Sequence, residues 1–373
     1  MMQLETPSEL AVEALTTDDI PAAMELKNVL GWNQTPEDWQ RFLRLAPEGA
    51  FKLLVQGRLA GTALAFVFDD VCWIGMVMVA EAYRGQGHGK MLVQSCLEHA
   101  ATRRCTLVQL DATRDGVSLY AHLGFKPTHL VGTCRGRIEP PEGGHVRSDS
   151  SAGLGVTARR RGEPVQRGET AEVVAGLRLT PIRPGDLAEV AALEAEALGV
   201  NREALFRELV GGESAGHPAG GRAAGGRASG GHPTGGRAGG ARDAGGRDST
   251  GRVADPGLLS SQGGGMVCRS PEGELTGFLL NRPGYHSVQV GPLIARDDVT
   301  AAQLLRATLG EICARSPECD VTLAVPLYNE AMLGELRRWG LPVTPRLTHM
   351  FRGRRRLQAR EDMVYALSGP EKG

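Results

Sequence analysis

The chain has 373 residues, with 42 Lys and Arg against 43 Asp and Glu, and a formal net charge of −1. This length allows two domains with cores of their own, and the balanced charge argues against a general positive field for nucleic acid. The seven cysteines form no Cys-x-x-Cys pair, no apolar run is long enough to cross a membrane, and residues 1–7 carry no secretion signal. We therefore expect a cytoplasmic protein, and the Arg-, Ala- and Gly-rich composition is typical of a GC-rich bacterial gene.

The first 80 residues predict a strand, two helices and an antiparallel meander. Thr16 or Thr17 caps a helix over 18–30, and Trp39 and Phe42 mark the apolar face of a second helix. The strands, identified from runs of apolar and β-branched residues, cover 10–15, 51–55, 59–68 and 71–79.

A glycine-rich turn follows the last of these strands and leads into a helix over 91–101. It reads Tyr83-Arg84-Gly85-Gln86-Gly87-His88-Gly89-Lys90. A strand–turn–helix of this kind gathers unpaired backbone N–H groups, which bind an anion. A P-loop is excluded because Met91 stands where Ser or Thr is required, and the glycine spacing excludes the dinucleotide fingerprint. What remains is Arg-x-x-Gly-x-Gly.

A second block lies downstream, where a strand over 107–113 precedes a short helix ending at Gly124. The helix carries Leu-Tyr-x-x-Leu-Gly-Phe over residues 119–125. Over residues 8–138, the two blocks together resemble the GCN5-related N-acetyltransferase (GNAT) superfamily, in which the first binds the coenzyme A pyrophosphate. The predicted order β-α-α-β-β-β-α-β-α-β is also that of the family. Thr113 replaces the asparagine that the family usually has before the tyrosine.

The resemblance implies an acetyl-CoA-dependent N-acetyltransferase, in which a primary amine attacks the thioester directly. Acetyl-CoA is the implied co-substrate, and no metal is expected. The N–H of Val77, near a bulge in its strand, would contact the acetyl carbonyl, and Tyr120 would protonate the leaving thiolate. Val79 would pair with the pantetheine amide. The implied cofactor-binding residues are Val77, Val79, Arg84, Gly85, Gln86, Gly87, His88, Gly89 and Lys90.

The general base must take a proton from an alkyl ammonium near neutral pH, which favours a carboxylate or a histidine. Asp111, at the end of the strand before Tyr120, is the favoured candidate, and Glu81 and His122 are the alternatives. The acceptor is expected to be a small molecule or a protein or peptide that bears an amine. The resemblance does not fix its identity, and the oligomeric state is left open.

Residues 177–367 repeat the predicted order of elements. We therefore expect the α/β (α+β) fold class, with two tandem GNAT-like domains, each a mixed, mostly antiparallel sheet flanked by helices. In the second copy the glycine turn is replaced by residues 296–300, in which Asp297 and Asp298 would repel a pyrophosphate, and Leu336 stands at the tyrosine position. This half is expected to bind no coenzyme A, to pack on the catalytic half and to wall its acceptor site, as in bacterial tandem proteins with an active N-terminal and a degenerate C-terminal domain.

Two segments of different composition complete the chain. Residues 139–176 are rich in Pro, Gly, Ser and charge and predict a flexible linker. Residues 213–262 interrupt the second domain with Gly/Ala/Arg pentapeptides, which predict a disordered insertion. Two alternative functions stay open: a module that senses acyl-CoA without turnover, and a nucleic-acid-associated modifier using Arg159–Arg161 and the Gly-Arg segment. The absence of aromatic residues from that segment argues against RNA binding.

Overall fold

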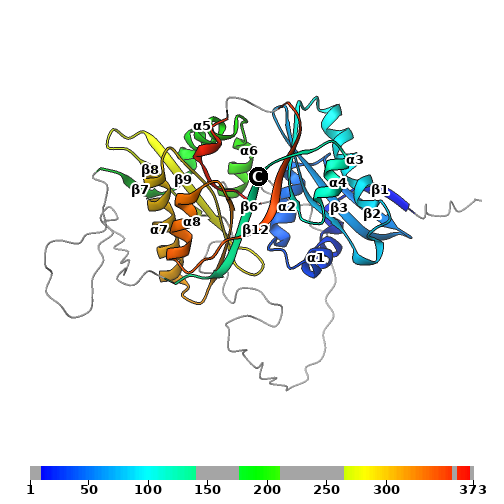
Figure 1. Cartoon of the computed structure of the whole chain (residues 1–373), viewed down its shortest axis with the longest axis horizontal. Coiled ribbons are helices and arrows are strands. Elements are labelled where there is room, and N and C mark those ends of the chain that lie inside the picture. The colour runs from blue at the N-terminus through cyan, green and yellow to red at the C-terminus, as the bar shows by residue number, and fades with distance from the viewer. Residues whose placement is uncertain (1–9, 140–175, 211–263, 355–358, 370–373) are drawn as a thin grey trace, which may run out of the picture.

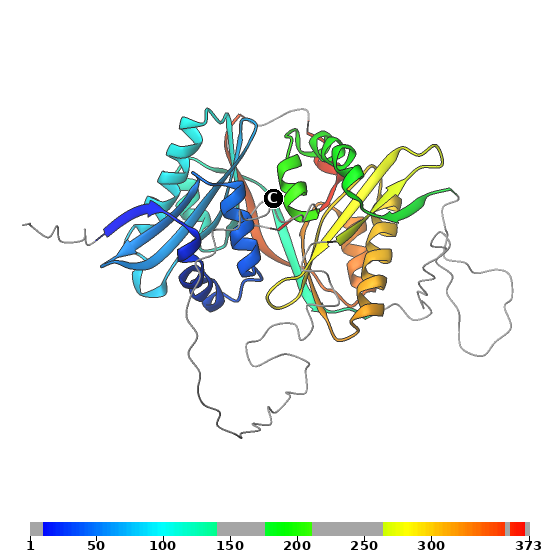
Figure 2. The ribbon, with the colours of Figure 1, turned by 180° about the vertical axis from the view of Figure 1, so that it is seen from behind.

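A computed structural model describes residues 10–139, 176–210, 264–354 and 359–369. The predicted insertion, 213–262, and the predicted linker, 139–176, apart from its two end residues, lie outside the described residues. The described residues form two α/β halves that share one mixed sheet (Figures 1 and 2). The predicted fold class of two tandem α/β domains is confirmed.

The N-terminal half follows the predicted order of elements. Its helices α1 (Ile20–Val29) and α2 (Pro36–Leu45) pack on one face of the sheet, and α3 (His88–Thr102) and α4 (Val117–His122) pack on the other. A reciprocal capping box starts α2, because the Thr35 hydroxyl accepts from the Asp38 N–H and the Asp38 carboxylate accepts from the Thr35 N–H. The strands are β1 (Leu10–Ala14), β2 (Ala50–Val55), β3 (Arg58–Phe68), β4 (Val71–Val79), β5 (Leu107–Thr113) and β6 (Lys126–Arg137).

The C-terminal half repeats this order. Its helices are α5 (Leu187–Leu198), α6 (Glu203–Val210), α7 (Asp298–Arg315) and α8 (Glu330–Arg338). Its strands are β7 (Arg178–Pro181), β8 (Gly264–Arg269), β9 (Leu275–Arg282), β10 (Val288–Ala295), β11 (Asp320–Pro326), β12 (Thr344–Gly353) and β13 (Val364–Ala366). Of the described strands of this half, β13 is the one that the predicted order of elements does not include.

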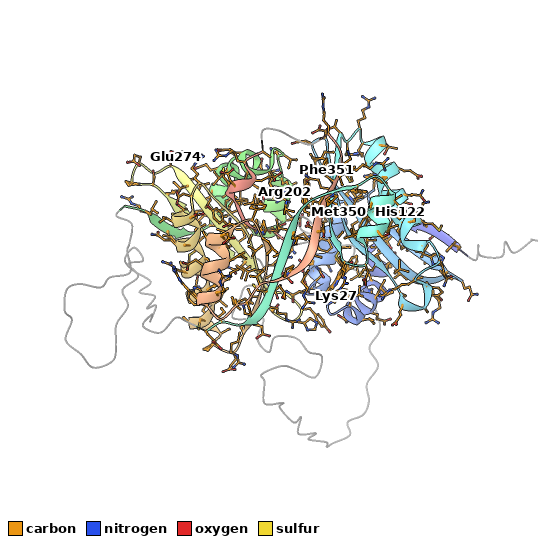
Figure 3. All side chains as sticks on the ribbon, in the orientation of Figure 1. Lys27, His122, Arg202, Glu274, Met350 and Phe351 are labelled. Carbon is orange, nitrogen blue, oxygen red and sulfur yellow. The ribbon has the colours of Figure 1, made fainter. Side chains whose placement is uncertain are left out.

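The strand order shows how the two halves are joined. It runs β1-β2-β3-β4-β5-β12-β6-β11-β10-β9-β8-β7, with β13 paired to β10. Strands β1 to β6 of the N-terminal half correspond in turn to β7 to β12 of the C-terminal half. With each strand replaced by its counterpart, the order reads the same from either end. β12 therefore pairs with β5 of the N-terminal half, and β6 pairs with β11 of the C-terminal half. Figure 3 places Met350 and Phe351 of β12 beside the N-terminal half. The last long strand of each half thus completes the sheet of the other.

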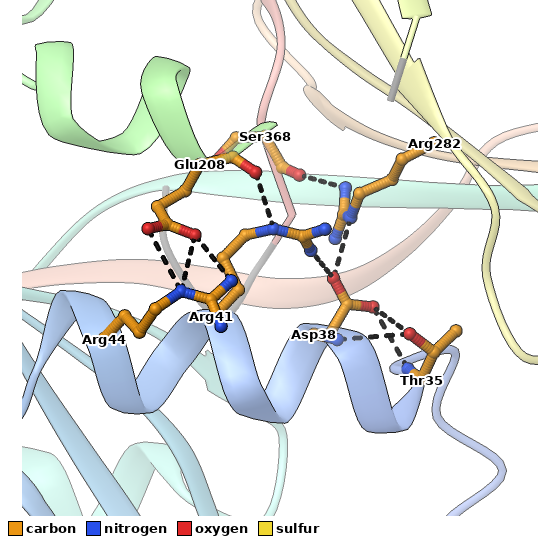
Figure 4. A network of polar contacts seen from close by, with 7 residues as sticks. All are labelled: Thr35, Asp38, Arg41, Arg44, Glu208, Arg282 and Ser368. Atoms are coloured by element: carbon orange, nitrogen blue, oxygen red, sulfur yellow. Dashed lines mark hydrogen bonds and ion pairs between the residues drawn. The ribbon is translucent and has the colours of Figure 1, made fainter. Parts of the chain in front are cut away.

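A buried ionic network also joins the halves (Figure 4). The side chain of Asp38 on α2 is only 2% exposed, and its Oδ1 accepts from Arg41 at 2.5 Å and from Arg282 of β9 at 3.1 Å. Arg282 also donates to the backbone carbonyl of Ser368, and Arg41 to that of Glu208. One carboxylate thus lies between two guanidinium groups from opposite halves, so neither partner can be removed without leaving a buried charge.

Candidate active site

Strand β4 contains the bulge that the resemblance implied. Pairing with β3 runs to Gly75 and resumes at Met78, so Met76 and Val77 together face a single β3 residue. Met76 has a positive φ of 52°, and the Thr62 hydroxyl donates to its carbonyl at 2.8 Å. A bulge of this kind redirects backbone groups locally. Val77 therefore lies where the ordinary strand ladder is interrupted.

β4 and β5 stop pairing shortly before the bulge. Their parallel ladder contains three pairs, from Val71–Leu107 to Trp73–Gln109, although both strands continue further. Within the described part of the N-terminal half, no other strand fills this side of β4. The unpaired edges lie at the carboxyl ends of two parallel strands, where ligands bind in open α/β sheets.

The glycine turn stands at the end of β4 and is shaped for an anion. Gly85 and Gly87 have φ values of +74° and +84°, and a Cβ on either would meet no atom within 4 Å. Helix α3 begins at His88, three residues earlier than predicted, with Gly87 as its N-cap. In the described residues, no side chain caps this helix and no acid lies in its first turn. Its first N–H groups are therefore open to a ligand.

Side chains of the turn hold it in place. The Arg84 guanidinium donates from Nε to the carbonyl of Val79 at 3.0 Å, and the Gln86 amide donates to Ala82. His88 is buried, with its Nδ1 3.0 Å from the Tyr83 carbonyl oxygen. Gly89 approaches α4 so closely that a Cβ would lie 3.4 Å from Leu119 Cδ2, which places α4 beside the turn. Lys90 is exposed in the first turn of α3.

Tyr120 lies on α4, one residue after the contact with Gly89. Its side chain is buried, and its ring packs edge-on against Phe125 at 5.9 Å. Burial, and to a smaller extent the nearby Cys96, raises the pKa of the Tyr120 phenol. The phenol therefore keeps its proton throughout the neutral range, as a proton donor must.

Asp111 lies in the part of β5 that no longer pairs with β4, but it is not a free carboxylate. Its side chain is fully buried, and its Oδ1 lies 2.9 Å from Nδ1 of His349 on β12. The two alternative bases are placed differently, since Glu81 and His122 are both exposed and the His122 Nδ1 lies 2.6 Å from the Ser118 carbonyl oxygen. His349 could not be identified from the sequence, because nothing local indicates that it lies opposite Asp111.

In the C-terminal half, the chain fills both corresponding places itself. The β10–β11 ladder also stops early, after Gln289–Thr322, but β13 pairs with β10 beyond that point and Leu367 donates to Ala324 of β11. The N-terminus of α7 is capped by Asp297, which accepts from the Thr300 N–H at 2.8 Å. Strand β13 and the Asp297 side chain thus occupy the two places that are open in the N-terminal half.

Of the helices that the structure describes, none has the length and hydropathy needed to cross a bilayer. Nor does the described part of the chain gather three or more His, Cys, Asp or Glu side chains in an arrangement that could hold a metal ion.

Comparisons with known proteins all find similarity to acetyltransferases. The model of the Acetyltransferase (GNAT) family matches residues 17–125, and that of the Acetyltransferase (GNAT) domain matches residues 258–366. The uncharacterized N-acetyltransferase YitH of Bacillus subtilis (strain 168) is 28% identical over 123 residues. That alignment covers 32% of this chain and 41% of YitH, so it spans about two fifths of the relative.

Solved structures resemble the chain over nearly its whole length. A candidate acetyltransferase from Pyrococcus horikoshii superposes with a TM-score of 0.63 at 15% identity, covering 100% of this chain and 99% of that one. A tandem GNAT protein from the clavulanic acid biosynthesis pathway, determined without acetyl-CoA, gives a TM-score of 0.51 at 13% identity, covering 92% and 98%. At these identities the likeness shows the fold alone.

Proposed function

Because the chain belongs to the GNAT superfamily of acetyltransferases, with a GNAT domain in each half, we propose that its N-terminal half transfers the acetyl group of acetyl-CoA to a primary amine. Members of this family use acetyl-CoA. The observation that carries the proposal is the contrast between the halves. The helix N-terminus at Gly87 is open and the β4 edge is unpaired, whereas Asp297 and β13 fill the equivalent places.

The residues of the turn fit the pyrophosphate of acetyl-CoA. Backbone N–H groups at the start of α3 would bind it, and the helix dipole favours the negative charge there. Arg84 fixes the turn through Val79, and Lys90 adds a positive charge. Gly85, Gln86, Gly87, His88 and Gly89 contribute the rest of the cradle, and Val79 would pair with the pantetheine amide.

The chemistry then needs three further groups. The N–H of Val77 would donate to the acetyl oxygen, where a backbone donor aimed at developing charge contributes about 3 kcal/mol. A general base would remove a proton from the amine, and Asp111 would be part of that base. Attack by the amine nitrogen on the carbonyl carbon breaks the carbon–sulfur bond, and Tyr120 supplies the proton that the sulfur takes. The acceptor is a small molecule or a protein or peptide with an amine, and the C-terminal half walls its site.

Calorimetric titration with acetyl-CoA tests the proposal directly. We expect one molecule bound per chain. Gly87→Val should weaken binding at least tenfold, because a positive φ costs a side chain on the order of 1–2 kcal/mol and its Cβ stands in the cradle. Gly273→Val is the matched control, since Gly273 also has a positive φ and open surroundings but lies in the β8–β9 turn. Two bound molecules, or equal losses in both variants, would contradict the proposal.

A thiol-release assay with acetyl-CoA and a panel of polyamines, aminoglycosides and peptides tests turnover. We expect release with at least one amine class. Binding without any release would favour the alternative of an acyl-CoA sensor.

A further inference from the structure

A histidine of β12, His349, contacts the N-terminal half close to the point where β4 and β5 stop pairing. Asp111 and His349 are register partners, although 238 residues separate them in sequence. The 2.9 Å contact makes Nδ1 of His349 the donor to the Asp111 carboxylate. An imidazole held in this way keeps its proton on Nδ1 and carries the lone pair on Nε2.

Two aromatic rings pack against the ring of His349. His129 of β6 stacks on it at 4.9 Å with an interplanar angle of 20°, and Trp73 of β4 lies at 5.4 Å with an angle of 35°. The Thr128 hydroxyl donates to the His349 backbone carbonyl at 3.2 Å. Because Nδ1 contacts Asp111, Nε2 is the ring nitrogen left to reach a ligand.

His349 lines a cavity of ≈ 60 Å³ between the two halves, which Trp73, Gln109, His129, Tyr328 and Glu361 also line. Two buried polar atoms beside the ring, Asp111 Oδ2 and Trp73 Nε1, have no hydrogen-bond partner among the described residues. Buried polar atoms are rarely left unpaired. Trp73 lines the cavity, which has room for about two water molecules or a small polar group, so its unpaired Nε1 indicates a polar occupant.

The dyad lies level with the bulge. Counted from the last β4–β5 pair, Trp73–Gln109, Asp111 is two residues further along β5 and Met76 three residues further along β4. Alternation along β5 also places Asp111 on the face of Trp73 and Leu107, which is the face covered by α1 and α2, opposite Tyr120. A group on this face would approach the acetyl carbonyl from the side away from the proposed proton donor.

We infer that His349 is the general base of the proposed acetyl transfer, and that Asp111 is its positioning residue. This inference rests on the proposed function. As the amine nitrogen bonds to the acetyl carbon, Nε2 of His349 takes the amine proton, directly or through a water in the cavity, while the sulfur leaves with the proton of Tyr120. The Asp111 carboxylate stabilises the imidazolium that forms. The active site is therefore built from both halves of the chain.

The structure also allows a simpler interpretation, in which the dyad only ties β12 to β5. Variants separate the two interpretations. We expect His349→Gln to lower kcat by about 100- to 10,000-fold, the usual contribution of a general base, while the Kd for acetyl-CoA changes less than threefold. Imidazole added to His349→Ala should raise the kcat of this variant at least tenfold. A purely structural role of His349 would not allow such a rescue. Asp111→Asn should lower kcat with an unchanged Kd for acetyl-CoA.

The pH profile gives a second readout. The titratable groups that face the His349 ring are Asp111 of β5, His129 of β6, and Tyr328 and Glu361 of the C-terminal half. We expect the acidic limb of the kcat/KM profile to disappear in His349→Gln. Retained turnover and profile in that variant, or loss of activity in His122→Gln instead, would overturn the assignment. Absence of thiol release by the wild-type protein would reject the proposed function itself, and the inference with it.

Discussion

Replacing Lys27 with methionine should remove a pH dependence from the stability of the fold. Lys27 lies on α1 with no exposed surface, and its Nζ donates to the Trp32 carbonyl at 3.0 Å. The same atom lies 3.8 Å from the ring centre of Tyr285, in the C-terminal half. Burial lowers the pKa of Lys27 from 10.5 to about 8, although the Asp38 carboxylate opposes this.

The sign of the effect follows from the proton balance. Between pH 8 and 10.5, the unfolded chain binds more protons than the folded chain, so the free energy of unfolding rises with pH through this window. Below pH 8 both states are protonated and the contribution is constant. The difference of about 2.5 pKa units (10.5 − 8) corresponds to about 3.4 kcal/mol at most.

Urea unfolding at pH 7.5 and pH 10 measures this contribution. We expect the free energy of unfolding of the wild type, relative to Lys27→Met, to rise by about 2.4 kcal/mol between these pH values. Other titrations cancel in the comparison. Lys126→Met, which changes an exposed lysine at the start of β6, should keep the wild-type slope. A difference between wild type and Lys27→Met that stays constant with pH would refute the reasoning.

Three further predictions concern the bulge, the acid and the ionic network. Thr62→Val should leave the Met76 carbonyl unpaired at a cost of about 1–3 kcal/mol in the free energy of unfolding and lower kcat, and Thr62→Ser should restore both in urea unfolding and thiol release. Tyr120→Phe should lower kcat about 100-fold with the KM for acetyl-CoA changed less than twofold, and unchanged turnover would remove the phenol from the mechanism. Asp38→Asn should cost about 3–5 kcal/mol by urea unfolding, whereas Asp362→Asn, in an exposed pair, should cost less than about 1 kcal/mol.

The elements predicted from the sequence are those with a local cause. Helix α2 is fixed by its Thr35 cap and its apolar face, and the turn before α3 by Gly85 and Gly87, because capping and positive φ act over a few residues. The helix-capping Asp297 of the second half is likewise visible in sequence. For these reasons the order of elements and the glycine turn before α3 could both be predicted from the sequence.

The remaining features depend on contacts between distant residues. The pairing of β12 with β5 follows from no pattern near either strand, so the Asp111–His349 contact had no signal in the sequence. β13 is only three residues long, too short for a periodicity to identify it. Asp111 could be chosen from the sequence as a candidate base, but its partner His349 is identified only by the pairing of β12 with β5.

The exchange of β6 and β12 also sets an order of events during synthesis. Once residue 137 has been made, the outer edge of β5 still lacks its neighbour, because β12 is translated only after nearly the whole chain. For ribosomes adding about 5–20 residues per second, the 238 residues between Asp111 and His349 correspond to a delay of roughly 10–50 s. An open strand edge is a template for association with other chains. A nascent chain therefore passes through a period in which β5 has no β12 to cover its edge, and a ribosome that stops before β12 releases a product without this strand and without His349.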